Sequence, residues 1–220
     1  MNQELIHVYF MPGMAASPTI FEFIKLPEEQ FKIHRLEWKI PLENETLKDY
    51  AKRMANDVEH ENVVLIGVSF GGILVQEMSR FLTLRKLIVV SSVTCKQQLP
   101  KRMKFLKKTK LYKILPTSLA SNIEVLAKLA YGKPIIKRLE LYKKYLSVRD
   151  TKYLDWAIEQ MVCWEQAEPI SGTIHIHGEK DLVFPMKHIK DCMVVKGGTH
   201  IMIITKYKWF NENLPRLILH

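Results

Sequence analysis

The chain has 220 residues, of which 47% are hydrophobic and 25% charged, and its formal net charge is +10 at pH 7. A chain of this length can bury one sizeable core, and no apolar run approaches the roughly 20 residues of a membrane-spanning helix. The composition therefore indicates an ordinary globular protein. It excludes repeat, low-complexity and disulfide-framework classes, the last because the three cysteines are widely spaced and odd in number.

Strand and helix signals alternate through the first half of the chain. Apolar runs rich in β-branched and aromatic residues predict strands at 5–10, 32–38, 63–68 and 86–91. A short helix is expected at 17–23, an amphipathic helix at 46–58, and a buried helix directly after the third strand. Because such alternation through short loops is typical of a parallel sheet covered on both faces, we predict an α/β fold.

The alternation stops between Cys95 and Gln166, where apolar residues recur at helical spacing over 123–130, 135–146 and 154–161. Strand signals resume at 173–177 and 192–195, followed by a helix from about 201 to 213. We therefore expect about six mostly parallel strands. The core would comprise 1–94 and 169–220, with a helical insertion at 95–168 that we interpret as a lid.

The segment Gly67-Val68-Ser69-Phe70-Gly71 fits the G-x-S-x-G pattern and lies where a predicted strand meets a predicted helix. Such a turn strains the backbone of the serine, and the flanking glycines let strand and helix approach closely. One interpretation is a tight turn without a catalytic role. The strand-to-helix context favours the other, in which Ser69 is a nucleophile.

An acid and a histidine each follow a later predicted strand. Asp181 comes after 173–177, with Pro185 suited to the first turn of a following helix, and His200 comes after 192–195. Taken alone, Asp181 fits a helix cap or a loop carboxylate equally well, and His200 fits a solvated loop histidine. A serine nucleophile needs a base and a group that orients the base, so the three together predict a Ser69–His200–Asp181 triad.

These segments resemble motifs of the α/β-hydrolase superfamily, which has its serine, acid and histidine in this order. The H-G-x-x-D and G-G-x-H style segments of that superfamily look like His177 to Asp181 and Gly197 to His200. The resemblance extends from about Leu5 to Leu214 and implies a hydrolase fold with a helical lid. It also implies that the usual leading antiparallel strands are absent here.

The first conserved loop of that superfamily usually reads His-Gly-x, and this chain has Pro12-Gly13-Met14 at the corresponding place. The resemblance implies that the backbone N–H groups of Met14 and Phe70 form the oxyanion hole, a role that survives changes of side chain. The alternative is a simple Pro-Gly turn.

The remaining histidines are not expected to act as bases. Packing or loop roles are predicted for three that lie in or beside predicted strands: His7, His175 and His177. His34 and His60 lie in polar surroundings, and we assign them no partner. Ser91 and Ser92 lack flanking glycines and are interpreted as loop residues. No cysteine pair has metal-ligand spacing, so we expect no metal and no cofactor.

Positive charge is concentrated in the predicted lid: between Lys96 and Arg149 there are fifteen Lys or Arg and two Glu. We favour a solvated lysine-rich face around a helical core, with attraction of anionic substrates or an anionic membrane surface as the alternative. No reading module is evident, so no nucleic-acid partner is expected. Apolar side chains that could line an acyl pocket are Phe105, Leu106, Leu111, Tyr112, Leu126, Leu129 and Tyr131.

The sequence thus predicts a serine hydrolase that cleaves an ester or thioester of a small molecule through an acyl-enzyme. The same triad acting on an amide or a carbon–carbon bond, or in acyl transfer, is an alternative. A non-catalytic ligand-binding protein, or a basic lid that binds anionic surfaces, are others. A cytoplasmic location is expected because the start of the chain lacks signal-peptide features.

Overall fold

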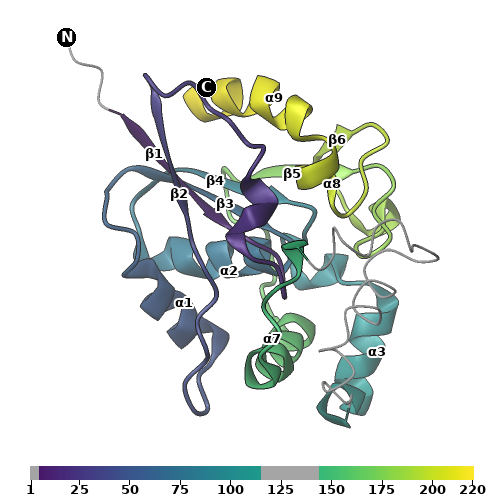
Figure 1. Cartoon of the computed structure of the whole chain (residues 1–220). Coiled ribbons are helices and arrows are strands. Elements are labelled where there is room, and N and C mark those ends of the chain that lie inside the picture. The colour runs from purple at the N-terminus through teal and green to yellow at the C-terminus, as the bar shows by residue number, and fades with distance from the viewer. Residues whose placement is uncertain (1–4, 115–143) are drawn as a thin grey trace.

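A six-stranded, entirely parallel sheet forms the centre of the computed structural model, which describes residues 5–114 and 144–220 (Figure 1). Its strand order is β2-β1-β3-β4-β5-β6. The strands are β1 (Ile6–Met11), β2 (Phe31–Arg35), β3 (Val63–Val68), β4 (Leu84–Val90), β5 (Ile174–Gly178) and β6 (Met193–Val195). The α/β fold and the number of strands are confirmed.

Helices cover both faces of this sheet, as a parallel sheet requires. In Figure 1, α1 and α2 lie on one side of the sheet and α9 lies on the other. The α-helices are α1 (Leu47–Ala55), α2 (Phe70–Met78), α3 (Lys101–Thr109), α7 (Thr151–Cys163), α8 (Met202–Thr205) and α9 (Tyr207–Leu219). Every residue of β3 is buried, which explains why its sequence is continuously apolar.

Short 3-10 helices complete the described elements: η1 (Pro18–Phe21), η2 (Ser79–Phe81), η3 (Lys96–Gln98), η4 (Leu111–Ile114) and η6 (Met186–His188). The short helix expected at 17–23 is η1. Within the described residues, no helix is both long and apolar enough to cross a membrane.

Several predicted boundaries differ from the structure. β2 ends at Arg35 rather than at residue 38. The Leu36 N–H still donates to the Phe10 carbonyl of β1 at 2.9 Å, and the Trp38 indole N–H donates to the Gly13 carbonyl at 2.9 Å. The helix predicted at 201–213 is two helices that separate at Lys206, whose φ of −119° is not helical. The second of them, α9, continues past Pro215 because a buried apolar stripe continues through Leu214 and Ile218.

The helix expected after Pro185 is the single 3-10 turn η6. Pro185 lies at its N-cap with an extended backbone, rather than inside its first turn. The preceding loop is held by other bonds, since the Asp181 carboxylate accepts the N–H groups of Val183 and Phe184 at 2.8 and 2.9 Å.

The described parts of segment 95–168 are largely helical, with η3, α3, η4 and α7. The helical spacing predicted at 154–161 lies in α7, which the Asp150 side chain caps by accepting the Tyr153 N–H at 2.9 Å. The spacing predicted at 123–130, and that at 135–146 up to residue 143, lies outside the described residues. The division of the chain into core and lid stays a prediction.

Candidate active site

Ser69 occupies the turn between β3 and α2 with φ 55° and ψ −122°, a conformation that costs a residue with a side chain about 1–3 kcal/mol. The flanking glycines explain how this turn fits. A Cβ on Gly67 would lie 2.3 Å from the Gly71 carbonyl oxygen, and a Cβ on Gly71 would lie 2.2 Å from the Pro12 carbonyl oxygen. Both positions therefore require glycine.

Hydrogen bonds from β4 and the bend after it hold this turn in place. The Ser69 N–H donates to the Val90 carbonyl at 2.9 Å, and the Ser92 hydroxyl donates to the Ser69 carbonyl at 2.6 Å. Ser91 and Ser92 form a bend after β4, as predicted. The contact of Ser92 with the Ser69 backbone could not be predicted from local patterns, because the two residues are 23 positions apart.

His200 joins Ser69 to Asp181. Its Nε2 lies 2.9 Å from the Ser69 Oγ, and its Nδ1 lies 2.9 Å from the Asp181 Oδ2. The three side chains come from loops that follow β3, β5 and β6, and therefore from the same edge of a parallel sheet. The structure thus brings together all three residues of the predicted triad, although Ser69 and His200 are 131 positions apart.

Asp181 is held as a buried carboxylate. Its side chain is 0% exposed, and its Oδ1 accepts the Val183 and Phe184 N–H groups. Burial acts to raise the pKa of Asp181, but His200, the Phe184 N–H and His177 outweigh it, and the net effect lowers the pKa. An ionised Asp181 fixes the His200 ring so that Nε2 faces the serine.

The loop Pro12-Gly13-Met14 passes directly beside Ser69. A Cβ on Gly13 would lie 3.2 Å from the Ser69 Cβ. Phe70 is the first residue of α2, so its N–H is one of the helix-start donors without a carbonyl partner inside the helix. Met14 and Phe70 therefore flank the serine on two different segments, and their oxyanion role stays a prediction.

Trp38 also belongs to this region, and the sequence analysis missed it. Its indole N–H donates to the Gly13 carbonyl, and its ring stacks on Phe70 with centroids 5.3 Å apart and planes at 11°. Trp38 thus contacts both segments that flank Ser69. Its position at the end of a predicted strand was the one available signal, and nothing in the sequence linked it to Gly13.

A described part of the predicted lid segment bonds to the chain just after Gly13. The Val148 N–H donates to the Ala15 carbonyl and the Ser17 N–H donates to the Tyr145 carbonyl, each at 3.0 Å. Residues 145–148 therefore pack against residues 15–17, which closely follow Gly13 in the chain.

Two buried histidines near the triad have packing roles, as predicted. The Nε2 atoms of His175 and His177 lie 3.1 and 2.8 Å from the carbonyl oxygens of Ser92 and Phe184, to which they donate. Burial lowers the pKa of His175 to about 4 and also lowers that of His177. Both rings are therefore neutral near pH 7.

The interpretation of His34 and His60 as residues without partners is wrong. The His7 Nδ1 lies 2.8 Å from the His34 Nε2, and the His60 Nδ1 lies 2.7 Å from the Tyr9 hydroxyl. We call His7, His34 and His60 the histidine cluster. Its members meet because β1 pairs with β2 and the loop before β3 folds beside them.

The described lysines of α3 and η4 are mostly solvated, as predicted. Two of them pair with acids, Lys107 with Glu165 and Lys113 with Glu159, and Lys96 of η3 also pairs with Glu165. Phe105 and Leu111 are exposed, whereas Leu106 and Tyr112 are half-buried. The other suggested pocket residues, Leu126, Leu129 and Tyr131, lie outside the described residues.

Neither a protein-family model nor a curated protein matches this sequence. Solved structures do match its fold. A bromoperoxidase from Bacillus anthracis is 17% identical with a TM-score of 0.73, over 100% of this chain and 94% of that one. A carboxylesterase structure from Nitrososphaera gargenis is 15% identical with a TM-score of 0.71, over 98% and 90% of the two chains.

A third similar structure is described as an α/β-hydrolase fold protein, from Burkholderia ambifaria. It is 11% identical with a TM-score of 0.69, over 96% of this chain and 90% of that one. The chain therefore has the α/β-hydrolase fold, as its motifs predicted.

Proposed function

We propose that this protein is a serine hydrolase that cleaves an ester or thioester of a small molecule. The observation that carries the proposal is the pair of 2.9 Å contacts that join the Ser69 Oγ to His200 and His200 to Asp181. A hydroxyl is a poor nucleophile near pH 7, and this arrangement supplies both the base and the group that orients it.

In the proposed first half-reaction, the Ser69 Oγ attacks the substrate carbonyl carbon while the His200 Nε2 takes the hydroxyl proton. The carbonyl π electrons move to oxygen, and the resulting oxyanion accepts the N–H groups of Met14 and Phe70. When the intermediate collapses, the carbon–oxygen or carbon–sulfur bond to the leaving group breaks. The leaving group takes the proton from His200, and the acyl group remains on Ser69.

Water completes the second half-reaction. His200 takes a proton from water as the hydroxide attacks the acyl carbon, and the bond to the Ser69 Oγ breaks. The carboxylic acid leaves and Ser69 regains its proton from His200. Asp181 keeps its negative charge throughout and stabilises the imidazolium form of His200.

The choice of ester or thioester rests on the fold and on the relatives that share it, which include a carboxylesterase. The same arrangement would serve an amide, or an acyl acceptor other than water. A substrate series that varies the scissile bond and then the acceptor separates these reactions, because only the preferred one reaches a high kcat/KM.

The test is release of p-nitrophenol from acyl esters of increasing chain length, comparing wild type with Ser69→Ala. We expect kcat to fall by about 10⁴-fold or more in the variant. The matched control is Ser79→Ala, since the Ser79 hydroxyl donates only to a helix carbonyl at the far end of α2 and activity should be unchanged. Equal activity in wild type and Ser69→Ala, or no activity in a folded wild type on any acyl compound, would overturn the proposal.

A further inference from the structure

The histidine cluster lies at the β2 edge of the sheet and is not used by the proposed mechanism. His7 is on β1, His34 is on β2, and His60 is in the loop between α1 and β3. One ring nitrogen from each lies within 4.8 Å of the others, the one such grouping of potential metal ligands among the described residues. All three side chains are half-buried and therefore remain in contact with solvent.

We propose that His7, His34 and His60 bind one divalent transition-metal ion of the zinc class. Imidazole nitrogen is a preferred ligand for zinc, copper and nickel ions, whereas calcium and magnesium ions prefer oxygen. Three histidines supply three of the four positions of a tetrahedral zinc site, and water fills the fourth.

The spacing of the rings is close to what such an ion requires. Zinc-to-nitrogen bonds of about 2.0–2.1 Å place tetrahedral ligand nitrogens about 3.3 Å apart. The His7 Nδ1 and His34 Nε2 are 2.8 Å apart, and the widest separation in the cluster is at most 4.8 Å. The nitrogen separations would therefore change by about 0.5–1.5 Å, and the stacked His7 and His60 rings would tilt so that both in-plane lone pairs meet the ion. The ion takes the place of the proton that His7 and His34 share in their hydrogen bond.

Neighbouring rings restrict the movement of the three ligands. The His7 and His60 rings stack with centroids 3.4 Å apart, and the His34 ring stacks on Tyr9 at 4.3 Å. A 2.7 Å hydrogen bond joins the Tyr9 hydroxyl to the His60 Nδ1, and that hydroxyl also accepts the Glu59 N–H at 3.2 Å. Metal-bound histidines are commonly oriented in this way by a hydrogen bond to their second nitrogen.

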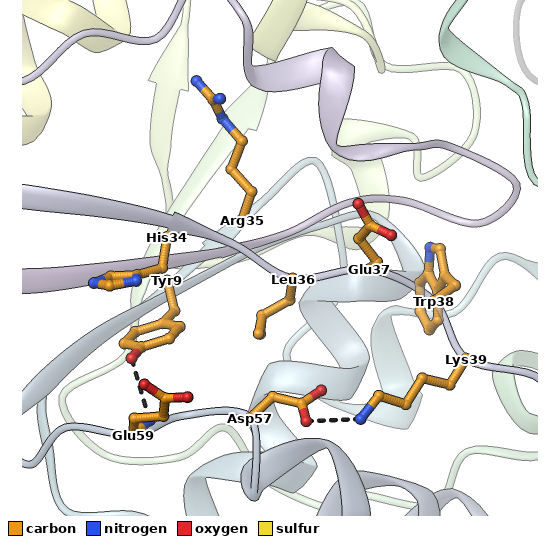
Figure 2. A pocket seen from close by; sticks show the side chains of 9 residues that line it. All are labelled: Tyr9, His34, Arg35, Leu36, Glu37, Trp38, Lys39, Asp57 and Glu59. Carbon is orange, nitrogen blue, oxygen red and sulfur yellow. Dashed lines mark hydrogen bonds and ion pairs between the residues drawn. The ribbon is translucent and has the colours of Figure 1, made fainter.

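A polar pocket of about 430 Å³ opens beside the cluster and gives an ion a route to it (Figure 2). Tyr9, His34 and Glu59 lie together at one end of this pocket, and the Lys39–Asp57 ion pair lies across from them. Glu59 is exposed there and adds negative charge close to His34.

Binding requires the neutral form of each imidazole, because the metal takes a ring-nitrogen lone pair. The bound ion would cross-link β1, β2 and the loop before β3, so it would stabilise the folded chain.

The test is zinc binding by the purified full chain, measured by competition with a chromophoric chelator and by metal analysis after dialysis. We expect one Zn²⁺ per chain, and an affinity about 100-fold lower in His34→Ala and in His60→Ala. Tyr9→Phe removes the bond to His60 and should weaken binding about tenfold. Zn²⁺ at about 100 times its Kd should raise Tm by about 5–10 °C, while Mg²⁺ and Ca²⁺ should have no effect.

Two controls separate this site from other histidines. His220→Ala removes an exposed histidine at the end of α9, and His200→Ala removes the proposed catalytic base. Both should bind Zn²⁺ as wild type does, although His200→Ala should lose esterase activity. If one cluster variant fails to fold, the other and Tyr9→Phe still decide the matter. Binding of far fewer than one Zn²⁺ per chain, or equal Zn²⁺ affinity in wild type and the folded cluster variants, would overturn the proposal.

Discussion

The proposed triad and the histidine cluster are both built from residues far apart in the chain, but the backbone positions them differently. Ser69, Asp181 and His200 each follow a strand, and parallel strands end at a common edge. The histidine cluster depends on the register between β1 and β2, which pairs Tyr9 with His34, and on the path of the loop that carries His60. The positions of the triad residues can therefore be predicted from the order of the strands in the sequence. The histidine cluster can be predicted only once the pairing register of β1 and β2 is known.

The largest expected effect comes from Asp181→Asn, which should impair the proposed triad and leave the histidine cluster intact. The amide cannot hold His200 in the required tautomer, so kcat should fall by about 10⁴-fold. Zinc affinity should be unchanged, because Asp181 has no contact with the cluster. Ester kinetics and chelator competition on the same preparation measure both quantities. Loss of both together would indicate that the variant damages the whole sheet rather than the triad.

His175 gives a test based on pH, because burial is the largest cause of its lowered pKa and the charge of His177 lowers that pKa further. The unfolded chain takes up a proton near pH 6.5, but the folded chain takes it up only near the His175 pKa of about 4. Stability should therefore fall as pH drops below 6.5, by about 2 kcal/mol from this group between pH 6.5 and 5. Urea unfolding at the two pH values should show a loss smaller by that amount in His175→Gln.

The same pH dependence in wild type and His175→Gln would contradict this assignment. His177, whose pKa is lowered in the same direction, gives a second variant for comparison. Asp181 affects folding stability at lower pH than the histidines do. Its pKa is lowered in the folded state, so its ionised form stabilises the folded chain, and this stability is lost as pH falls and the carboxylate becomes protonated.

Trp38 lines the pocket beside the histidine cluster and also contacts Gly13, so it tests whether the two regions are independent. Trp38→Phe keeps an aromatic ring but loses the donor that fixes the Gly13 carbonyl. We expect kcat/KM to fall about tenfold through a less well placed Met14 N–H, with zinc affinity changed less than twofold. Trp156→Phe is the matched control, because the Trp156 indole donates instead to the Glu45 carbonyl. An equal loss of activity in both variants would contradict a specific role for Trp38.

The sequence predicted the sheet and the three triad positions because both depend on local patterns. The apolar run of β3, the glycines around Ser69 and the strand endings before Asp181 and His200 are all visible within short windows. Features that depend on distant contacts were missed. The sequence shows neither the bond between Trp38 and Gly13, which lies just past the end of β2 at Arg35, nor the contacts of Asp181 with Val183 and Phe184 that hold the loop before Pro185.

Covalent labelling of Ser69 tests the central claim most directly. Wild type treated with a fluorophosphonate should gain the mass of one adduct, and peptide analysis should locate it on Ser69. Ser69→Ala should gain none, and His200→Ala should react far more slowly because the hydroxyl is no longer activated. An adduct on a different residue, or no reaction of the folded wild type, would contradict the assignment of Ser69 as the nucleophile.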